Sequence, residues 1–454
     1  GFMYPHGYLL QKIGADGWQE DIEDPIEREA AAISRVTTAD GRQLIFEVPL
    51  FVPPVHVAVW KIAIGINTLY LMDTDIDANV PWNRSISARL YAGHLEQRLR
   101  QEIVLGIGGI EMLARLGVNY RLIHLNEGHA AFALLEKIRR ALRDGLSFEA
   151  ACAAVRAETV FTTHTPVPAG HDVFPFPLIE KYFHSYWSDL GLDREVLFKL
   201  GGGHLEKNKE GFNMTVLALN LAHGRNAVSQ RHGEVSRQMW QGLWPDKSAN
   251  EVPIGSITNG IHPFTWGSPY MMTLFDKYLP GWANEPELLV RVDIIPDAEI
   301  QDAHAGAKAY LFQYIDEVAG VKFDPELLTI GFARRATAYK RANMIFSDPA
   351  LLKKIGNGKL QLVFAGKAHP ADDRPGAGPA GFLRDPGSPD RGAALAEPAD
   401  QELPDQDRDR IQHSPYDISN HLARLRSRLR NMMAAGIRDT NSSPPTLSSG
   451  QSTG

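Results

Sequence analysis

Apolar and polar positions in the first part of the chain alternate in short blocks that predict strands followed by helices. In "PPVHVAVWKIAIG", Val55, Val57 and Val59 recur at every second position, which is the period of a strand with one buried face. "NTLYLMDTDID" continues as a second strand that runs into an acidic loop. "LEQRLRQEIVLGIGGIEMLARLG" has helical spacing on either side of a glycine cluster.

A repeated rhythm of strand and helix follows. "NYRLIHLN" predicts a short buried strand, and we expect a helix from about Glu127 to Arg143. "DGLS" ends this helix, and Ser147 has the position of an N-cap for a second one. "ETVFTTHTP" predicts another buried strand, which Pro166 stops, and "GSITNGIHP", "LLTIGFARR" and "KLQLVFAGKAHP" repeat the pattern. This alternation predicts an α/β fold with a largely parallel, doubly wound sheet.

Polar side chains stand at the carboxyl ends of five of these predicted strands. In open α/β sheets, ligands bind beyond the carboxyl ends of the strands. We therefore expect these side chains to share one ligand-binding rim. They are Asn126, Glu127 and His129, then His164 and Thr165, Thr258 and Asn259, Arg334 and Arg335, and Lys367 and His369.

Composition narrows the class of protein. The length of 454 residues predicts two or three domains, because a single core seldom exceeds roughly 250–300 residues. The net charge of −7 argues against a general nucleic-acid binder. Cys152 is the only cysteine, which excludes an intrachain disulfide and fits a reducing compartment. The chain has no signal peptide and no apolar run of about 18 residues, so we expect no membrane span.

The composition changes after Asp373. Residues 374–454 are rich in proline, glycine and charge, and their only aromatic residues are Phe382 and Tyr416. Such a segment cannot bury enough apolar surface to offset the entropy of ordering it, so we predict disorder. The bias towards Arg, Pro, Gly, Ala and Asp is what a shifted reading frame of GC-rich DNA produces. Our hypothesis is that 374–454 is a frameshifted or mispredicted translation.

Two histidine-rich stretches invite a metal-site interpretation. "HLNEGH" places His124, Glu127 and His129 close together, but the helical spacing of a zinc protease motif is absent. "HTPVPAGH" places His164 and His171 in a loop stiffened by two prolines. We therefore predict no metal site. The chain also has no Walker A lysine motif, and "LGIGG" alone is more typical of helix packing or a turn than of a phosphate cradle.

A cluster of cations gives a stronger signal. In "IGFARRATAYKRANMIF", Arg334, Arg335 and Lys340 leave a predicted strand and enter a predicted helix, whose N-terminus favours anions. Arginine presents a planar fork to phosphate oxygens, and lysine a compact charge. A solvated basic turn is the alternative. The position at the predicted rim favours a phosphate site.

These stretches together resemble the α-glucan phosphorylases of glycogen, starch and maltodextrin, especially the shorter bacterial and archaeal type. The matches span Gly1 to Asp373 in the family's order. They are "GYLLQKIGADGWQ", "LYLMDTDID", "RLRQEIVLGIGG", "HLNEGHAAFALLE", "FTTHTPVPAGHDVFP", "FNMTVLALNLAHGRNAVSQRHGEVSRQMW", "ITNGIHPFTW", "IGFARRATAYKRANMIF" and "FAGKAHPADD".

The resemblance implies a glycosyltransferase-B type of α/β fold with two Rossmann-like, doubly wound domains, here incomplete at both ends. Residues 1–298 would be a partial N-terminal domain and 299–373 the start of the C-terminal one. It also implies reversible phosphorolysis of α-1,4-glucans by inorganic phosphate, which gives glucose 1-phosphate, in a cytoplasmic enzyme that is compatible with a homo-oligomer. The implied cofactor is pyridoxal 5′-phosphate, whose phosphate group exchanges protons with substrate phosphate.

The resemblance also assigns roles to single residues. Arg335 matches the arginine that holds substrate phosphate, and Lys340 the lysine at the cofactor phosphate, with Arg334 in a neighbouring basic position. Trp266 matches a tryptophan beside the cofactor, and a core position is the alternative.

On the sugar side, His164 matches the histidine at the 6-hydroxyl of glucose, and Asn259 binds the same region. His129 matches a histidine that lines the active-site channel, and Thr258 and Asn126 are further substrate-binding positions. A helix cap at His129 and an ordinary turn at "TNG" are the alternatives.

Departures from the family pattern limit what the resemblance predicts. The chain starts at Gly1, and the opening of the family's N-terminal domain is missing. The segment that carries the Schiff-base lysine is missing too, and no lysine follows Lys367. We therefore predict a fragment that is inactive as written. Alternatives are a noncatalytic glucan-binding remnant, or a nucleotide-sugar glucosyltransferase of the glycogen synthase kind, against which "GEVSRQMW" and "FAGKAHPADD" argue.

Overall fold

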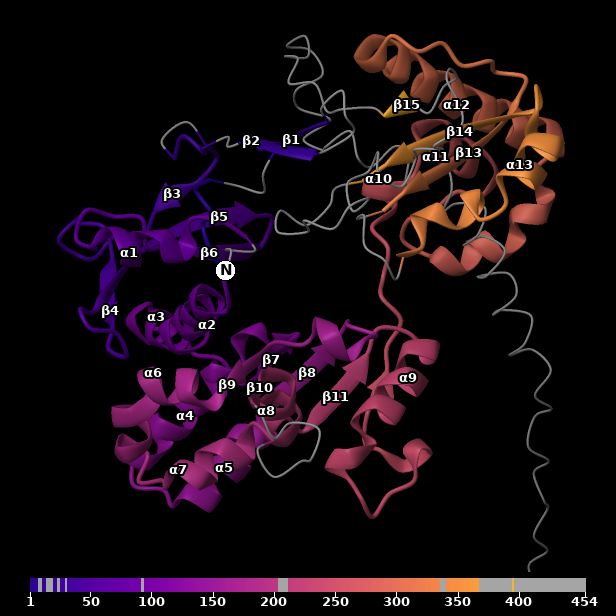
Figure 1. Cartoon of the computed structure of the whole chain (residues 1–454). Coiled ribbons are helices and arrows are strands. Elements are labelled where there is room, and N and C mark those ends of the chain that lie inside the picture. Colours follow the sequence, from indigo (N-terminus) through magenta and orange to yellow (C-terminus); the bar gives the residue numbers. More distant parts are fainter. Residues whose placement is uncertain are drawn as a thin grey trace, which may run out of the picture. The chain divides into compact units, whose positions relative to one another are not determined.

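The computed structural model describes residues 1–6, 10–13, 19–22, 25–28, 31–90, 94–202, 211–334, 340–366 and 394–395. The chain divides into two compact units (Figure 1). The first comprises Gly1–Leu10 and Glu23–Gly260, and the second Gln11–Ile22 and Ile261–Gly454. The predicted tail, apart from 394–395, lies outside the described residues, and so do Arg335, Lys367 and His369.

The first unit begins with an antiparallel sheet. β5 (Val55–Ile64) pairs with β6 (Asn67–Asp73), β4 (Ile45–Val48) and β3 (Ser34–Arg35). Val55, Val57 and Val59 are fully buried, which confirms the predicted strand and its inward face. β6 ends at Asp73, where the predicted acidic loop begins.

A parallel sheet with the strand order β12-β11-β8-β7 follows in the same unit, and β7, β8 and β11 lie side by side in Figure 1. The predicted parallel arrangement is therefore confirmed for this sheet. Its strands are β7 (Ile123–Asn126), β8 (Thr159–Thr163), β11 (Gly224–Ala227) and β12 (Gly255–Ser256). A separate antiparallel pair is β9 (Val173–Pro175) with β10 (Gly211–Asn213).

Helices of the first unit pack with both larger sheets into one continuous core. Ser147 caps α5 as predicted, because its side chain accepts a hydrogen bond from the N–H of Ala150. The helices are α1 (Pro81–Arg84), α2 (Leu95–Ile103), α3 (Gly109–Arg115), α4 (Phe132–Arg143), α5 (Phe148–Ala157), α6 (Phe176–Asp189), α7 (Arg194–Leu200), α8 (Met214–Leu221) and α9 (Gln230–Trp240).

The glycine cluster is a helix-packing feature. A π-helical turn, Val104–Gly108, joins α2 to α3. A Cβ at Gly106 would lie 2.7 Å from the backbone nitrogen of Ala133 and 2.8 Å from Cβ of Phe132. Only glycine therefore lets this turn approach the start of α4 so closely.

The second unit has a smaller parallel sheet, in which β13 (Leu328–Ala333) pairs with β14 (Leu360–Ala365), and β14 with β15 (Ala394–Leu395). On α12, Leu311, Phe312 and Ile315 form a core with Val363 of β14. The remaining elements are α10 (Pro263–Trp266), α11 (Pro269–Tyr278), α12 (Asp297–Ala319), α13 (Pro349–Gly356) and the two-stranded sheet of β1 (Leu10–Ile13) and β2 (Gln19–Ile22).

Several expectations from the sequence are corrected. The five strand ends do not share one rim, because β7, β8 and β12 belong to one sheet and β13 and β14 to another. In β7 only Leu125 is buried, so this strand is not a fully buried one. The helix expected from Glu127 starts at Phe132, after a 3₁₀ turn at Gly128–Ala130. No α-helix begins at Lys340 either: the 3₁₀ turn Ala342–Phe346 precedes α13.

Candidate functional site

The strands of the four-stranded parallel sheet end at nearly the same level. The register pairs Asn126 with Thr162, and Thr162 with Asn226. The N–H of Asn259 donates to the carbonyl of Val228 at 3.2 Å, which ties the segment after β12 to the end of β11. Four predicted binding residues with exposed side chains therefore lie at one edge of one sheet: Asn126, His164, Thr258 and Asn259.

Glu127 links two of these strand ends. One of its carboxylate oxygens accepts hydrogen bonds from the backbone N–H of His164 and, at 2.7 Å, from that of Thr165. Its own N–H donates to the carbonyl of Thr162 at 2.9 Å. Its backbone has φ 66° and ψ 179°, a region that costs a side-chain-bearing residue on the order of 1–3 kcal/mol. Glu127, which has a strained backbone in the turn after β7, therefore fixes the segment after β8 by hydrogen bonds.

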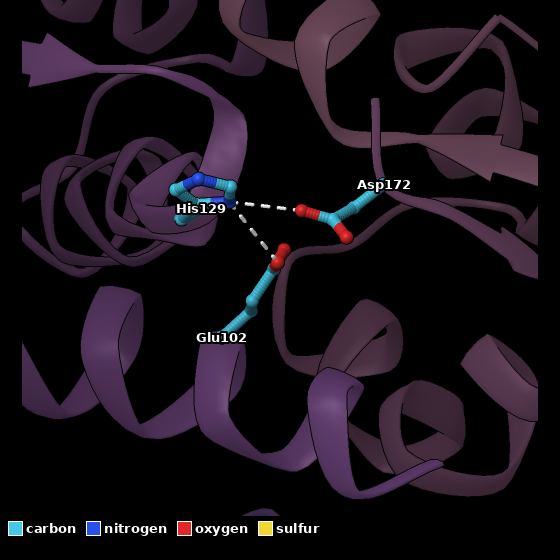
Figure 2. A group of neighbouring side chains, drawn as sticks. All are labelled: Glu102, His129 and Asp172. Carbon is cyan, nitrogen blue, oxygen red and sulfur yellow. Dashed lines mark hydrogen bonds and ion pairs between the residues drawn. The ribbon is translucent and has the colours of Figure 1, made fainter. Parts of the chain in front are cut away.

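His129 lies at the centre of a charged cluster in the same turn. Its Nδ1 is 2.8 Å from Oδ2 of Asp172 and 3.5 Å from Oε1 of Glu102 (Figure 2). Glu102 comes from α2 and is 1% exposed, whereas Asp172 precedes β9. Arg98, one turn before Glu102 on α2, places Nε 3.0 Å from Glu102 and Nη2 3.2 Å from Asp172. The cluster thus joins three separate segments of the first unit.

Burial and the neighbouring side chains shift the pKa values of Glu102, His129 and Asp172. Burial raises the pKa of Glu102 to about 8. Burial opposes protonation of His129, but its hydrogen bonds with Asp172 and Glu102 outweigh this and raise its pKa to about 9. Burial likewise disfavours ionised Asp172, yet the hydrogen bond from His129 and the charge of Arg98 hold its pKa well below the usual range. These shifts favour a charged His129, an ionised Asp172 and a protonated Glu102.

The Arg98 side chain already supplies a positive charge to this cluster. Ligand atoms of Glu102, His129 and Asp172 lie within 4.8 Å of one another, a spacing that could hold a metal ion. The guanidinium of Arg98 already contacts all three, with Nη2 2.7 Å from Nδ1 of His129. A metal ion at this place would meet that positive charge at close range. We therefore assign no metal ion to the cluster.

His124, the first residue of the histidine-rich stretch, takes part in another network. Its Nε2 lies 2.7 Å from Oγ1 of Thr162, and that hydroxyl donates to Oδ1 of Asn226 at 2.9 Å. The three side chains form a polar ladder across β7, β8 and β11. They do not combine with His129 into a metal site.

Three of the predicted site residues in the second unit are among the described residues. Trp266 ends α10 and is half-buried, so it is not a fully buried core residue. The N–H of Arg334 donates to the carbonyl of Ala365 at 3.0 Å, and its side chain is exposed at the carboxyl end of β13. Lys340 is half-buried. Arg335 stands between Arg334 and Lys340 in the sequence but outside the described residues.

Sequence reasoning missed Arg98, Glu102 and Asp172 as partners of His129. The spacing of Arg98 and Glu102 is that of a helical (i, i+4) ion pair, which was a usable signal. Nothing in the local pattern connects that pair with Asp172, which lies 74 positions after Arg98. Only the packing of α2 against the two loops brings these groups together.

Comparison with known proteins identifies relatives of this chain. It is 39% identical over 396 residues to "Glycogen phosphorylase" of Aquifex aeolicus. It is 38% identical over 392 residues to "Maltodextrin phosphorylase" of Thermococcus litoralis, and 36% over 408 residues to "Glycogen phosphorylase" of Mycobacterium bovis. The chain belongs to the α-glucan phosphorylase family.

Each of these alignments covers 82% of the chain but only part of the relative: 57% of the Aquifex protein, 46% of the Thermococcus protein and 47% of the Mycobacterium protein. The chain thus spans about half the length of the curated phosphorylases that it matches. No protein-family model matches it. Among the described residues, no helix is both long and apolar enough to span a membrane.

The residues of this family member only partly fit the implied cofactor. Arg334 and Lys340 are cations near the end of β13, a donor type that suits a phosphate group. The covalent bond to pyridoxal phosphate requires a lysine amine, and the sequence has no lysine after Lys367, where the family resemblance predicts it. The described residues do not make up a complete pyridoxal phosphate site.

Proposed function

We propose that this chain is an α-1,4-glucan phosphorylase, which acts reversibly on glycogen, starch or maltodextrin with inorganic phosphate to give glucose 1-phosphate. The observation that carries the proposal is the identity of 36–39% to relatives named glycogen or maltodextrin phosphorylase. The proposal includes a glycosyltransferase-B fold, with Rossmann-like domains over 1–298 and 299–373, and a cytoplasmic enzyme.

The sugar-binding part of the proposed site belongs to the parallel sheet of the first unit. The four side chains proposed for it are exposed and polar, and they follow the carboxyl ends of the strands, where ligands of open α/β sheets bind. His164 and Asn259 are proposed to hold the 6-hydroxyl region of glucose, with Thr258 and Asn126 beside them. Hydrogen bonds from such groups orient a sugar for attack at its anomeric carbon.

The phosphate-binding part belongs to the second unit. Arg334, Arg335 and Lys340 follow β13 within seven positions, and they supply three positive charges. Phosphorolysis brings a phosphate dianion to a carbon that develops positive charge, so cations that neutralise and orient the phosphate favour the reaction. Arg335 is proposed to hold substrate phosphate, and Lys340, Arg334 and Trp266 to face the cofactor.

An assay on purified protein tests the proposal. Maltoheptaose and inorganic phosphate are supplied with and without pyridoxal phosphate, and glucose 1-phosphate is measured alongside maltoheptaose binding. Formation of glucose 1-phosphate supports the proposal and shows the predicted inactivity to be wrong. Failure both to bind maltoheptaose and to form glucose 1-phosphate refutes it. Consumption of ADP-glucose or UDP-glucose would favour a glycogen-synthase-like enzyme instead.

A glucan-binding protein without turnover is the second candidate. The observation that favours it is that these 454 residues include the proposed sugar-binding strand ends but no lysine after Lys367, where the resemblance predicts the anchor of the cofactor. Binding of maltoheptaose with no glucose 1-phosphate, even with added pyridoxal phosphate, is the outcome that selects this candidate.

A further inference from the structure

Glu127 occupies a backbone conformation that suits glycine better than glutamate. Its φ of 66° makes it one of three non-glycine residues with positive φ among the described residues. The next residue is Gly128, so a glycine stands beside the strained position rather than on it. A side chain kept at a strained position points to a contact that the side chain makes.

The contact is with the backbone that carries His164. One carboxylate oxygen of Glu127 accepts from two successive N–H groups, those of His164 and Thr165. The following residue is Pro166, which has no N–H to donate. Hydrogen bonds to an ionised acceptor are about twice as strong as neutral ones. They fix the peptide planes on both sides of the His164 Cα, and hence the direction in which its exposed imidazole leaves the backbone.

The same turn also holds the far end of the loop from His164 to Asp172. His129, two positions after Glu127, lies 2.8 Å from the Asp172 carboxylate. Between them, Nδ1 of buried His171 lies 2.9 Å from Oγ1 of Thr215. Both ends of the loop are therefore fastened to the turn 127–129.

The turn itself cannot shift easily. A Cβ at Gly128 would lie 3.0 Å from the nitrogen of Thr215 and 3.1 Å from the carbonyl carbon of Met214, at the start of α8. The turn is thus packed directly against the backbone of a buried helix, all but one of whose eight residues are buried. A carboxylate mounted on so rigid a support can define the position of the loop that it binds.

We propose that Glu127 is a positioning residue for sugar recognition: its carboxylate sets the His164–Thr165 peptides so that the His164 side chain meets a glucose hydroxyl. This inference rests on the proposed function for the role of His164. It does not make Glu127 a catalytic residue, because its carboxylate oxygen is engaged by backbone N–H groups.

Two variants separate positioning from folding. Glu127→Gly removes the carboxylate while relieving the positive φ, so we expect a folded protein. Glu127→Gln keeps an acceptor oxygen without its charge and should give an intermediate effect. Glu111→Gln is the matched control: it removes a carboxylate of the same unit that pairs with Arg115 and Arg140 instead.

The first readout is hydrogen exchange of the His164 and Thr165 amides, which needs no ligand. In Glu127→Gly we expect both amides to exchange about tenfold faster or more, since each loses its acceptor, while amides of the β5–β6 pair keep their rates. Unchanged exchange of these two amides would overturn the inference whatever the sugar affinity.

The second readout compares the Kd of D-glucose with that of 6-deoxy-D-glucose. The unsubstituted protein should bind D-glucose about fivefold more tightly, because one neutral hydrogen bond changes Kd by about that factor. Glu127→Gly should lose most of this preference. A merely structural role would weaken both sugars equally and would overturn the inference. If the unsubstituted protein binds neither glucose nor maltoheptaose, the proposed function fails. Faster exchange of the two amides in Glu127→Gly would then show that Glu127 holds the His164–Thr165 backbone for a structural reason only.

Discussion

Nδ1 of His129 lies 2.8 Å from Oδ2 of Asp172, a contact between residues 43 positions apart. It joins the turn after β7 to the loop before β9, and Arg98 reaches the same carboxylate oxygen at 3.2 Å. The Asp172 carboxylate therefore pairs with two basic side chains, those of His129 and Arg98.

Asp172→Asn is expected to destabilise the protein by about 1–3 kcal/mol, because His129 and Arg98 lose their shared counter-ion while remaining close together. The pKa of His129 should fall in the variant, since the Asp172 hydrogen bond is the largest contribution that raises it. Chemical denaturation measures the first effect and NMR titration of the imidazole the second.

Asp189→Asn is the control for that substitution. Asp189 is 60% exposed and lies 4.0 Å from Arg143, so its loss should change stability by less than about 1 kcal/mol. Equal stabilities of the two variants, with an unaltered His129 titration, would show that Asp172 does not support the cluster.

The sequence correctly predicted the elements that depend only on residues close together in the chain. The period of two in β5 and the cap at Ser147 depend on a few neighbouring residues, and the structure has both. The parallel order of β7 and β8 follows from the helices between them. The helix start near Glu127 was misplaced because the strained turn and the tight packing of Gly128 are set by α8, far along the chain.

The site was predictable only in part for the same reason. Asn126, His164 and Asn259 could be placed at strand ends from the sequence, because strand ends are local features. The partners of His129 could not, since they come from α2 and from the loop before β9. The single predicted rim was wrong because a repeated strand–helix rhythm does not reveal that one sheet ends and another begins between β12 and β13.

Any side chain larger than that of glycine at position 106 should destabilise the protein. Gly106→Ala places a Cβ within 2.8 Å of two atoms of the α4 start, including a backbone nitrogen, and we expect a loss of about 1–3 kcal/mol from overpacking. Thermal or urea unfolding measures it. Gly109→Ala is the matched control, because no atom lies within 4 Å of its Cβ and alanine favours a helix by up to about 1 kcal/mol. A Gly106→Ala variant as stable as Gly109→Ala would contradict the packing argument.

Pyridoxal phosphate should not attach to this chain of 454 residues at a single lysine. The family resemblance predicts the anchoring amine beyond Lys367, and the sequence has none there. Protein incubated with pyridoxal phosphate and then reduced with borohydride is examined by intact mass and peptide mapping. We expect at most partial labels spread over several lysines. One lysine labelled in stoichiometric amount would show that the chain has an anchor that the resemblance did not reveal.

The buried carboxyl of Glu102 should make stability depend on pH. Its pKa rises from 4.5 unfolded to about 8 folded, and that of His129 from 6.5 to about 9. Both groups therefore bind more protons in the folded state, and stability falls as pH rises. The Glu102 contribution is complete below pH 4.5 and is lost by about pH 8. The His129 contribution is lost between 6.5 and about 9. Asp172 has the opposite sign, so its contribution is lost only on acidification.

Glu102→Gln isolates this effect, because glutamine resembles the protonated carboxyl in size and charge. Below pH 4.5, where the carboxyl is protonated in both states, we expect its unfolding free energy to lie within about 1 kcal/mol of the unsubstituted protein, and its stability to decline less as pH rises to about 8. Urea denaturation at several pH values measures both. Glu111→Gln, which also removes one acidic group of the first unit, should keep the original pH dependence. If Glu102→Gln declined as steeply as the unsubstituted protein, Glu102 would be ionised in the folded state, and the charge balance of the cluster would rest on Arg98 and His129 together.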